Sequence, residues 1–473
     1  MVGSRRWAAV VAAVAVAAVP VMLGEAGVAL AATRPLMISP ASAGWTWSLG
    51  QTVPGVPALG PGEFTTLGLI ACASEGNCAA AGTFNTVDAF LVNEVSGVWR
   101  TAIPIPGMAT LSPGGSVTIR SLACGSPGNC SAVGWYQAWN DVIQGFVVSE
   151  VNGTWHNAVQ VPGVIAPSGT VTVSVESVAC FSAGRCTAVG YFQDPQDGIF
   201  YGFVVNEVNG VWHTASRLPG MHGAGALSCP SPGNCTTIGG TFGGNYAQSE
   251  VNGIWRTPVA IPGLAALTLP SLRWLSCRSA GNCTVAGTYV GYGGLTQPLV
   301  ASEVNGTWHK ATPVPGMAAL TTGGNAEATS LSCGAPGNCS IGGFYGSGPG
   351  IQQAFIASQV NGTWHTAVEV PGTAALNKGG FAQIFYYSLA CPTAGNCTAG
   401  GWYTTSGGWW AGFAISEING TWHTAVKIAG TSLHPTFPVI IQALTCTSPG
   451  ECVAGGNGAY PGPVAEAWVA SQS

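Results

Sequence analysis

Short apolar stretches recur along this chain, each bounded by glycine, proline, asparagine or serine. One stretch covers residues 121–124, and the next, residues 130–135, begins just after Pro127 and Gly128. Proline followed by glycine suits the two central positions of a type II turn, so we expect the chain to reverse there. The pattern therefore predicts an antiparallel hairpin of two short strands.

A second hairpin follows in the same stretch of sequence. Residues 145–151 are rich in apolar side chains, and Asn152 and Gly153 separate them from residues 154–159. Asn-Gly is a strong hairpin signal, because both residues tolerate the positive φ of a type I′ turn. A two-residue loop places Glu150 opposite Trp155. Two hairpins give four antiparallel strands, A to D, which is the content of one β-propeller blade.

This unit recurs eight times, and two cysteines separated by five residues mark its first hairpin. A period of roughly 50 residues is typical of stacked units that bury their apolar surface against their neighbours. We expect each pair to form a disulfide bond at the base of the hairpin, worth about 2.4 kcal/mol by the chain-entropy estimate. The pairs use all 16 cysteines: Cys72 with Cys78, Cys124 with Cys130, Cys180 with Cys186, Cys229 with Cys235, Cys277 with Cys283, Cys333 with Cys339, Cys391 with Cys397 and Cys446 with Cys452.

The two ends of the chain indicate that the repeats close into a ring. The last repeat stops after its third strand, at residues 467–472, whereas a Trp-containing segment around Trp47 precedes the first repeat. An N-terminal strand that completed the last blade would leave no open sheet edge. We therefore predict an all-β fold, an eight-bladed β-propeller of four-stranded antiparallel blades whose last blade is completed by the N-terminal strand.

Two families of repeat propellers share short motifs with this chain. Residues 341–345 (Ile-Gly-Gly-Phe-Tyr) and 360–364 (Val-Asn-Gly-Thr-Trp) resemble a kelch repeat. Residues 149–155 resemble the Asp-box hairpin of sialidase-type propellers, with asparagine in place of aspartate. Either resemblance implies a β-propeller of the secreted bacterial type. Neither implies a particular chemistry, because propellers carry many unrelated activities.

The N-terminal residues differ in composition from the repeats. Arg5 and Arg6 precede an uncharged apolar run, and Ala29-Leu30-Ala31 follows it, which is typical of a secretory signal peptide. We predict a signal peptide at 1–31, a single propeller domain at 32–473, a secreted protein, and no stable membrane span after cleavage. An uncleaved N-terminal anchor is the alternative.

Charge and motif content exclude several functions. Charged residues make up 7% of the chain and the net charge is −5, so we expect no nucleic-acid partner. We expect no metal and no cofactor, because metal-binding and phosphate-binding motifs are absent and the cysteines are paired. A sialidase-type arginine triad is not expected, because few arginines follow the signal outside the rim: Arg120, Arg185, Arg217, Arg273 and Arg278. Of these, Arg185 and Arg278 sit beside cysteines, at the end opposite the variable loops.

Recurring polar residues are expected to belong to the scaffold. Glutamate occupies one hairpin position in six repeats, and a histidine or arginine follows the repeat tryptophan in seven. The glutamates are Glu94, Glu150, Glu207, Glu250, Glu303 and Glu417, with Gln359 in a seventh repeat.

The candidate ligand-binding residues lie where the repeats differ. All four aspartates of the mature chain fall in connections between the second and third strands, which share one face of a propeller with the connections between blades. Variable loops on a rigid scaffold commonly bind ligands. The candidates are Asp88, Asp141, Asp194, Asp197, Trp139, Tyr201, Tyr292, Trp409 and Trp410. The alternative is that these side chains only cap the blades.

Three functions are compatible with these observations. The first is a non-catalytic binding module for an extracellular glycan, a cell-wall polymer or another cell-surface ligand, since aromatic rings beside carboxylates suit sugars. The second is a glycoside hydrolase or polysaccharide lyase with Asp141 and Asp194 as paired carboxylates. The third is an envelope scaffold with no small ligand.

Overall fold

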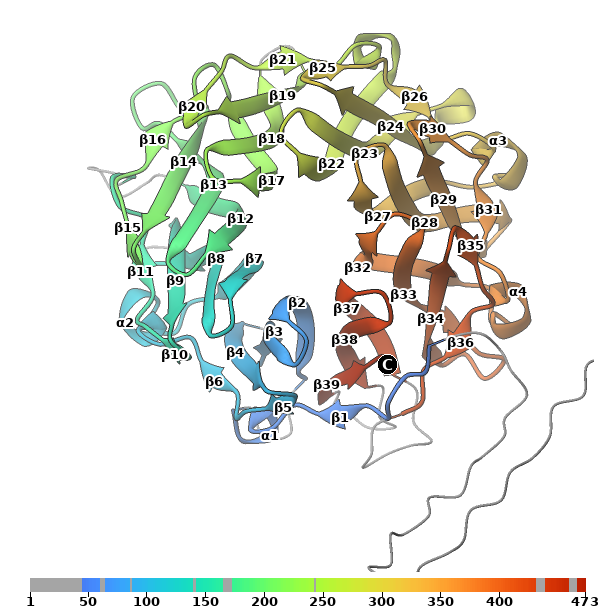
Figure 1. Ribbon diagram of the computed structural model, residues 1–473, viewed down its shortest axis with the longest axis horizontal. Coiled ribbons are helices and arrows are strands. Elements are labelled where there is room, and N and C mark those ends of the chain that lie inside the picture. Colours follow the sequence, from blue (N-terminus) through green and yellow to red (C-terminus); the bar gives the residue numbers. More distant parts are fainter. Residues whose placement is uncertain are drawn as a thin grey trace, which may run out of the picture. The chain divides into compact units, whose positions relative to one another are not determined.

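The structure is a computed structural model that describes residues 45–59, 64–85, 87–138, 142–164, 172–241, 244–430, 439–458 and 466–473. These residues lie within one compact unit, Gly44–Ser473. They form eight antiparallel sheets arranged in a ring (Figure 1). Residues of the innermost strands line a central channel. The predicted eight-bladed β-propeller is therefore confirmed. The predicted signal peptide lies outside the described residues, and among those described no helix is long and apolar enough to cross a membrane.

The second blade shows how the local sequence forms the sheet. Its strands are β7 (Val117–Ser126), β8 (Asn129–Gln137), β9 (Ile143–Val151), β10 (Thr154–Trp155) and β11 (Val159–Gln160). Both predicted turns are present, with Asn152 at φ 50° and Gly153 at φ 82° as a type I′ turn requires. Trp155 lies opposite Glu150, as predicted.

The outermost strand differs from the prediction of one continuous strand. It is split in two, because the chain leaves the sheet between Trp155 and Val159. The backbone N–H of Ala158 in this gap donates to the carbonyl of Pro106 in the preceding blade, at 2.8 Å. The split therefore replaces hydrogen bonds within the sheet by one hydrogen bond between blades. It also leaves only two-residue strands at the outer edge of the sheet.

The other blades repeat this plan. The remaining innermost strands are β2 (Thr66–Ser74), β12 (Val173–Ser182), β17 (Gly223–Ser231), β22 (Thr268–Ser279), β27 (Ala326–Ala335), β32 (Ala382–Thr393) and β37 (Val439–Ser448). The second strands are β3 (Asn77–Phe84), β13 (Arg185–Gln193), β18 (Asn234–Thr241), β23 (Asn282–Val290), β28 (Asn338–Gly348), β33 (Asn396–Thr404) and β38 (Glu451–Gly458). The third are β4 (Asp88–Val95), β14 (Phe200–Val208), β19 (Gly244–Val251), β24 (Thr296–Val304), β29 (Ile351–Val360), β34 (Trp410–Ile418) and β39 (Glu466–Ser471).

Short elements complete the outer edge. The outer strands are β5 (Val98–Trp99), β6 (Ile103–Pro104), β15 (Val211–Trp212), β16 (Ser216–Arg217), β20 (Ile254–Trp255), β21 (Val259–Ala260), β25 (Thr307–Trp308), β26 (Thr312–Pro313), β30 (Thr363–Trp364), β31 (Val368–Glu369), β35 (Thr421–Trp422) and β36 (Val426–Lys427). Single helical turns lie between blades: α1 (Val56–Leu59), α2 (Met108–Leu111), η1 (Leu264–Ala266), α3 (Met317–Leu320) and α4 (Thr373–Leu376). A further turn, η2 (Tyr292–Gly294), joins the second and third strands of blade 5.

The ring closes as predicted. The N-terminal strand β1 (Gln51–Thr52) pairs with β39, placing Thr52 opposite Trp468, and Trp47 forms a bridge with Gln472. Trp47 packs against the same cluster as Trp468, whose side chain is fully buried. The last blade is thus assembled from both ends of the chain.

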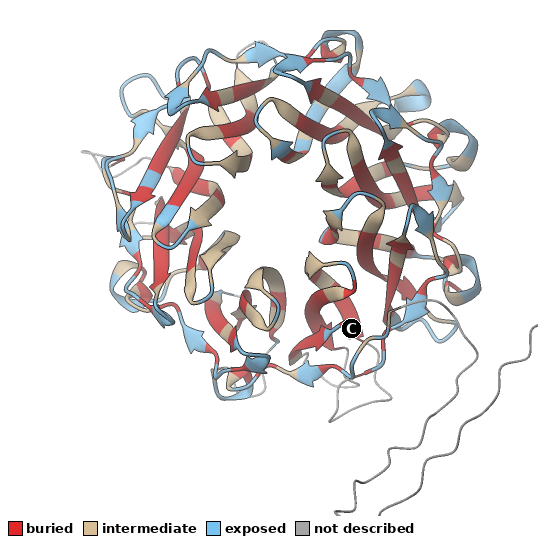
Figure 2. Cartoon of the chain, in the orientation of Figure 1, coloured by how far each residue is buried: buried red, intermediate tan, exposed pale blue. Residues whose placement is uncertain are grey.

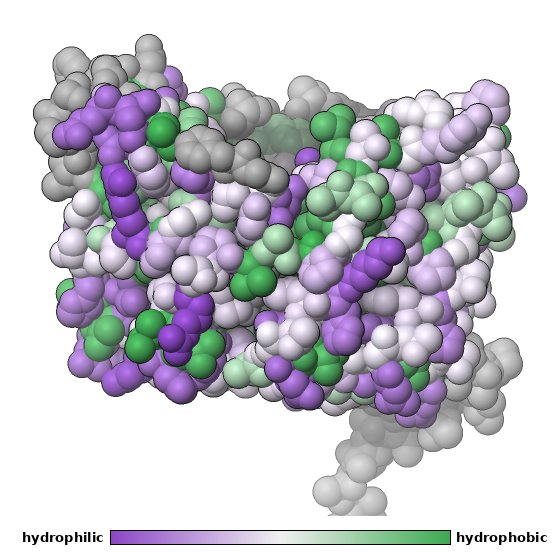
Figure 3. Space-filling model, turned by 90° about the horizontal axis from the view of Figure 1, so that it is seen from above, coloured by the Kyte–Doolittle hydropathy of each residue, from purple (hydrophilic) through white to green (hydrophobic). Residues whose placement is uncertain are grey.

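The core lies between neighbouring blades. Phe146 of blade 2, for example, packs with Ala79 and Leu91 of blade 1. Buried residues are concentrated in the middle strands and exposed ones at the outer edge (Figure 2). Seen from its edge, the outer wall shows hydrophobic residues as separate patches among hydrophilic ones (Figure 3).

The predicted cysteine pairs are all disulfide bonds, and each joins the innermost strand of a blade to its second strand. The bonded pairs are Cys72 with Cys78, Cys124 with Cys130, Cys180 with Cys186, Cys229 with Cys235, Cys277 with Cys283, Cys333 with Cys339, Cys391 with Cys397 and Cys446 with Cys452. The disulfide prediction is therefore confirmed for every repeat.

The second cysteine of each pair is buried, which the sequence did not indicate. Its exposure is 4% or less in every blade: Cys78, Cys130, Cys186, Cys235, Cys283, Cys339, Cys397 and Cys452. Sγ of Cys186 lies 3.4 Å from the Ser131 hydroxyl, and Sγ of Cys397 lies 3.7 Å from that of Ser340, each in the preceding blade. The disulfides therefore lie not only at the base of a hairpin, as expected, but also against the neighbouring blade.

Three of the recurring glutamates, Glu150, Glu207 and Glu417, accept hydrogen bonds from the preceding blade. Glu207 accepts hydrogen bonds from Ser149 at 2.6 Å and Ser131 at 3.1 Å, both in the preceding blade. Glu150 likewise accepts one from Asn93 at 2.5 Å. All six recurring glutamates are buried, and burial raises the pKa of each. For Glu150 burial raises the pKa to about 7, although the bond from Asn93 opposes this.

These raised pKa values predict that the protein is more stable in acid than at neutral pH. Because the pKa of Glu150 rises from 4.5 to about 7 on folding, its contribution is full below pH 4.5 and is lost as the pH rises through 7. Glu150→Gln should fold, since Gln359 and Gln472 occupy this position in two blades. Above pH 7 we expect the variant to be more stable than the wild type by up to about 3 kcal/mol.

Urea unfolding at pH 4 and pH 8 measures this effect. The difference between Glu150→Gln and the wild type should shrink toward zero at pH 4. A difference that does not depend on pH would show that Glu150 is ionised in the folded protein as readily as in the unfolded chain.

Candidate functional site

The sequence-predicted ligand residues that the structure describes are spread over four blades. They belong to the connections between second and third strands of blades 1, 3, 5 and 7. Asp88 begins β4, Tyr292 is fully exposed in η2, and Trp409 and Trp410 are half exposed, with the ring centroid of Trp410 5.2 Å from that of Trp402. Trp139 and Asp141 lie outside the described residues. For all the candidate residues, a role in ligand binding remains a prediction.

Blade 3 does bring three of the predicted residues together. Asp194 forms an ion pair with Arg217, whose guanidinium lies 4.0 Å above the ring centroid of Tyr201. Asp197 accepts a hydrogen bond from the Tyr201 hydroxyl at 2.7 Å. The pKa of Asp197 is lowered, first by the backbone N–H of Ile199 and then by Tyr201. These groups bond to one another, so the cluster holds its own loop in place.

A different set of unrepeated side chains lines the central channel. In each innermost strand the pairing with the second strand is interrupted by a β-bulge four residues before the first cysteine. The residues at this position are Gly68, Arg120, Glu176, Gly225, Arg273, Thr329, Tyr387 and Gln442. Bulges redirect side chains and are common beside active sites. Of these residues, Arg120, Glu176, Gly225, Arg273 and Tyr387 line one recess of the channel, whereas Thr329 is fully buried and donates to the carbonyl of Ile384 in the next blade.

Two ion pairs cross between neighbouring blades at this level. Nε of Arg120 lies 3.7 Å from a carboxylate oxygen of Glu176, between blades 2 and 3. Arg273 donates to Glu327 at 3.1 Å, between blades 5 and 6. The arginine side chains are 46% and 55% exposed, whereas both glutamates are 20% exposed. The guanidinium groups therefore face the channel more than the carboxylates do.

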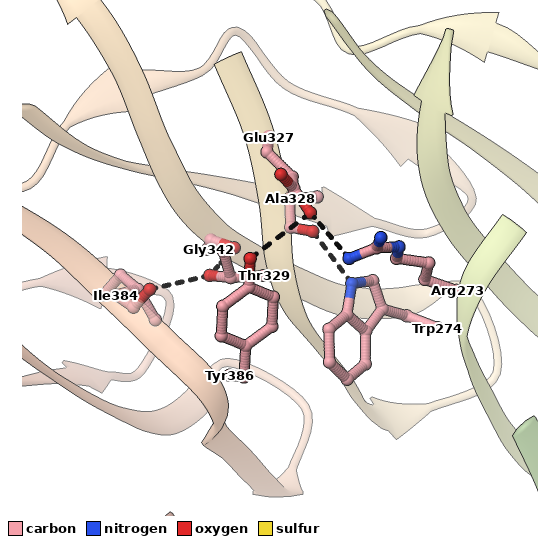
Figure 4. Close-up of polar contacts among 8 residues, drawn as sticks. All are labelled: Arg273, Trp274, Glu327, Ala328, Thr329, Gly342, Ile384 and Tyr386. Carbon is pink, nitrogen blue, oxygen red and sulfur yellow. Dashed lines mark hydrogen bonds and ion pairs between the residues drawn. The ribbon is translucent and has the colours of Figure 1, made fainter. Parts of the chain in front are cut away.

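Aromatic rings extend the second ion pair (Figure 4). The indole N–H of Trp274, next to Arg273, donates to the carbonyl of Ala328 at 2.8 Å. The Tyr386 hydroxyl lies 3.5 Å from the Glu327 carboxylate that accepts from Arg273. The ring of Tyr387 meets that of Trp274 edge-on at 4.9 Å between centroids. Blade 7 thus reaches past blade 6 to contact blade 5.

Tyr387 can reach this far because the bulge in blade 7 is enlarged. Four residues, 385–388, lie between the paired residues Ile384 and Leu389, where most blades have one. Tyr387 has a φ of 57° and is 55% exposed. Burial raises the pKa of the Tyr387 hydroxyl. The charge of Glu176 raises it further, whereas the charges of Arg120 and Arg273 lower it. Its hydroxyl is therefore under the influence of both ion pairs.

Blade 4 provides the space next to these groups. A recess of about 590 Å³ lies against its small inner residues, Gly223, Ala224 and Gly225, and Arg120, Glu176, Arg273, Trp274 and Tyr387 line the remainder. A Cβ atom at Gly223 would meet nothing within 4 Å, and at Gly225 its nearest neighbour would be 3.6 Å away. Tyr191 near the end of β13 and Asn245 near the start of β19 also line the recess.

The sequence does contain a signal for this site. The residue two before the first cysteine is Leu, Ile or Val in every repeat, whereas the residue four before it changes from glycine to arginine, glutamate or tyrosine. The site does not resemble an arginine triad, because Arg120 and Arg273 each pair with a glutamate of the next blade. Among the described residues, no group of three or more His, Cys, Asp or Glu side chains could hold a metal ion.

Comparison with known proteins gives distant similarities. No family model and no curated protein matches this chain. A solved xyloglucanase from Xanthomonas campestris is similar over 89% of this chain and 69% of its own, with 12% identity and a TM-score of 0.45. YCF48 from Cyanidioschyzon merolae is similar over 75% and 95%, with 12% identity and a TM-score of 0.40. An ulvan lyase is similar over 73% and 88%, with 12% identity and a TM-score of 0.41.

These values are too low to support any activity, so the function has to be argued from the geometry of the recess. The more specific resemblances to kelch and Asp-box repeats stay predictions.

The backbone of Tyr387 gives a stability test of this geometry. At most positions alanine is more stabilising than glycine, but a left-handed φ reverses the order because the Cβ atom is strained there. We expect Tyr387→Gly to be more stable than Tyr387→Ala by about 1 kcal/mol in urea unfolding. Tyr386, which is not left-handed, is the matched control, and there alanine should be the more stable. The same order at both positions would contradict the enlarged bulge.

Proposed function

We propose that this protein is a secreted binding protein that holds an acidic saccharide in the recess at blade 4. The observation that carries the proposal is the recess itself, where exposed guanidinium groups and an exposed tyrosine surround a space bounded by glycine. Secretion is part of the proposal. It is supported by the signal-like N-terminal sequence and by eight disulfide bonds, which persist in oxidising compartments.

The aromatic side chains support a sugar as the ligand. Tyr387 offers an exposed ring, and the ring of Trp274 contacts it edge-on. The indole N–H of Trp274 in turn donates to the carbonyl of Ala328. A rigid aromatic face beside hydrogen-bonding groups is a common way to bind a pyranose ring. The left-handed φ of Tyr387 adds to this argument, because such strain is concentrated at functional sites.

The charges support an acidic group on that sugar. Each guanidinium has five N–H donors, and the bond from Arg273 to Glu327 engages one of them. Arg120 and Arg273 therefore present donors to the channel from either side of blade 4. A carboxylate or sulfate would bind such planar donors through charge-assisted hydrogen bonds. The glutamates are engaged by the protein, which suits recognition better than proton transfer.

A variant that fills the recess tests this function. Gly225→Trp should fold, because a Cβ atom there has room, and its indole would occupy the space next to blade 4. Tyr292→Ala is the matched control, since it removes an exposed aromatic residue outside the recess. A glycan array with uronate, sulfated and neutral oligosaccharides identifies the strongest ligand, and calorimetry measures its affinity.

We expect the strongest ligand to be acidic and its affinity to fall with added salt. Gly225→Trp should weaken it at least tenfold, and Tyr292→Ala should leave it unchanged. Failure of every acidic glycan to bind, or equal binding by Gly225→Trp, would contradict the proposal.

A further inference from the structure

The outer part of the ring carries a second type of cavity, which lies between neighbouring blades. Three such grooves have volumes of about 640, 640 and 670 Å³, between blades 2 and 3, 4 and 5, and 5 and 6. Each is lined by the repeat tryptophan of the following blade and by the His or Arg after the tryptophan of the preceding blade. The pairs are Trp212 with His156, Trp308 with Arg256, and Trp364 with His309.

The groove between blades 2 and 3 has a floor whose polar groups bond to one another. The indole N–H of Trp212 donates to Ser149 at 2.9 Å, and the hydroxyl of Ser149 donates to Glu207 at 2.6 Å. The serine therefore connects the tryptophan and the buried acid. This arrangement needs no ligand.

The groove between blades 5 and 6 has the same architecture but a different floor. Gln359 replaces the glutamate, and its amide nitrogen donates to Ser302 at 3.0 Å and to the carbonyl of Gly362 at 3.1 Å. Among the described residues, three buried polar atoms that line this groove then lack a partner. They are Oε1 of Gln359, Nε1 of Trp364 and Oε2 of Glu303.

Buried polar atoms are rarely left without a partner, and such exceptions call for an explanation. Gln359 is 3% exposed and lines this groove, whereas Glu303 is 5% exposed and lines both this groove and the one between blades 4 and 5. A volume of about 670 Å³ is far larger than the ~30 Å³ that one water molecule occupies in the liquid. The indole of Trp364 is half buried, so part of its ring faces the groove.

We infer that the groove between blades 5 and 6 is a second binding site, for a pyranose that presents neighbouring hydroxyl groups to its floor. A hydroxyl both donates and accepts, so one sugar edge can donate to Gln359 and accept from Trp364. The part of the Trp364 ring that is not buried offers a stacking surface. His309 and Lys310 stand at the opening and add donors for further hydroxyls. This site is independent of the channel.

The repeat itself supplies the test variant. Gln359→Glu recreates the residue present in six blades, so it should fold and should let Ser302 bond both the carboxylate and Trp364. Glu207→Gln is the matched control, because it makes the reverse exchange in another blade. The probes are glucose, galactose, mannose and N-acetylglucosamine, and the readout is the NMR signal of the Trp364 indole N–H, assigned with Trp364→Phe.

We expect at least one of these sugars to shift the Trp364 signal in a saturable way. Gln359→Glu should weaken this binding at least tenfold, whereas Glu207→Gln should not change it. Gly225→Trp should not change it either, which separates this site from the channel. A Trp364 signal that no sugar shifts, or equal binding by Gln359→Glu, would overturn the inference and leave ordered water as the partner of these atoms.

Discussion

The structure depends on the pairing of the two ends of the chain within one sheet. Backbone hydrogen bonds from Ser48 to Ser471 and from Val53 to Ala467, at 2.8 and 3.0 Å, join segments more than 400 residues apart in sequence. They close the ring, and the closed ring fixes the distance between any two blades. Within this ring, Trp274 of blade 5 and Tyr387 of blade 7 meet across blade 6.

Stability and recognition use different positions of the same repeat. The positions that recur, such as the disulfide pairs, the buried glutamates and the carbonyl of Pro106 that accepts from Ala158, join strands or blades. At the position four residues before the first cysteine a bulge interrupts the backbone pairing, and the side chain differs from blade to blade, from the buried Thr329, which bonds to Ile384 of the next blade, to the exposed Tyr387. This is also the position where arginine, glutamate and tyrosine gather around the recess. The groove between blades 5 and 6 differs from the others at a recurring position. There Gln359 replaces the glutamate, and its amide nitrogen donates to Ser302.

Local sequence signals were sufficient to predict the architecture. The Asn152-Gly153 turn, the cysteine spacing and the Trp-containing segment at the N-terminus each act over a few residues or by simple counting, and all three are confirmed. The split outer strand was not predictable in this way, because it depends on a hydrogen bond between Ala158 and Pro106 in different blades. The burial of Cys186 against Ser131 of the preceding blade escaped prediction for the same reason.

The channel site was missed for a related reason. Arg120 and Glu176 belong to different repeats, and they meet only because the ring brings equivalent positions side by side. The repeat sequence points instead to the long variable loops, and of the candidate residues there that the structure describes, Asp194, Asp197 and Tyr201 belong to one cluster. The pattern of apolar and polar residues does not show where a strand is irregular, so it does not reveal the bulges. A comparison of the repeats position by position does find the bulge residues, because they differ from repeat to repeat.

A crystal structure of the protein with an oligouronate soaked into it tests the central claim most directly. The account predicts density for one sugar ring in the recess at blade 4, with its carboxylate within hydrogen-bond distance of Arg120 or Arg273 and its ring against Tyr387. Density confined to the loops that carry Asp88, Asp194 and Trp409, with the recess holding water alone, would contradict it.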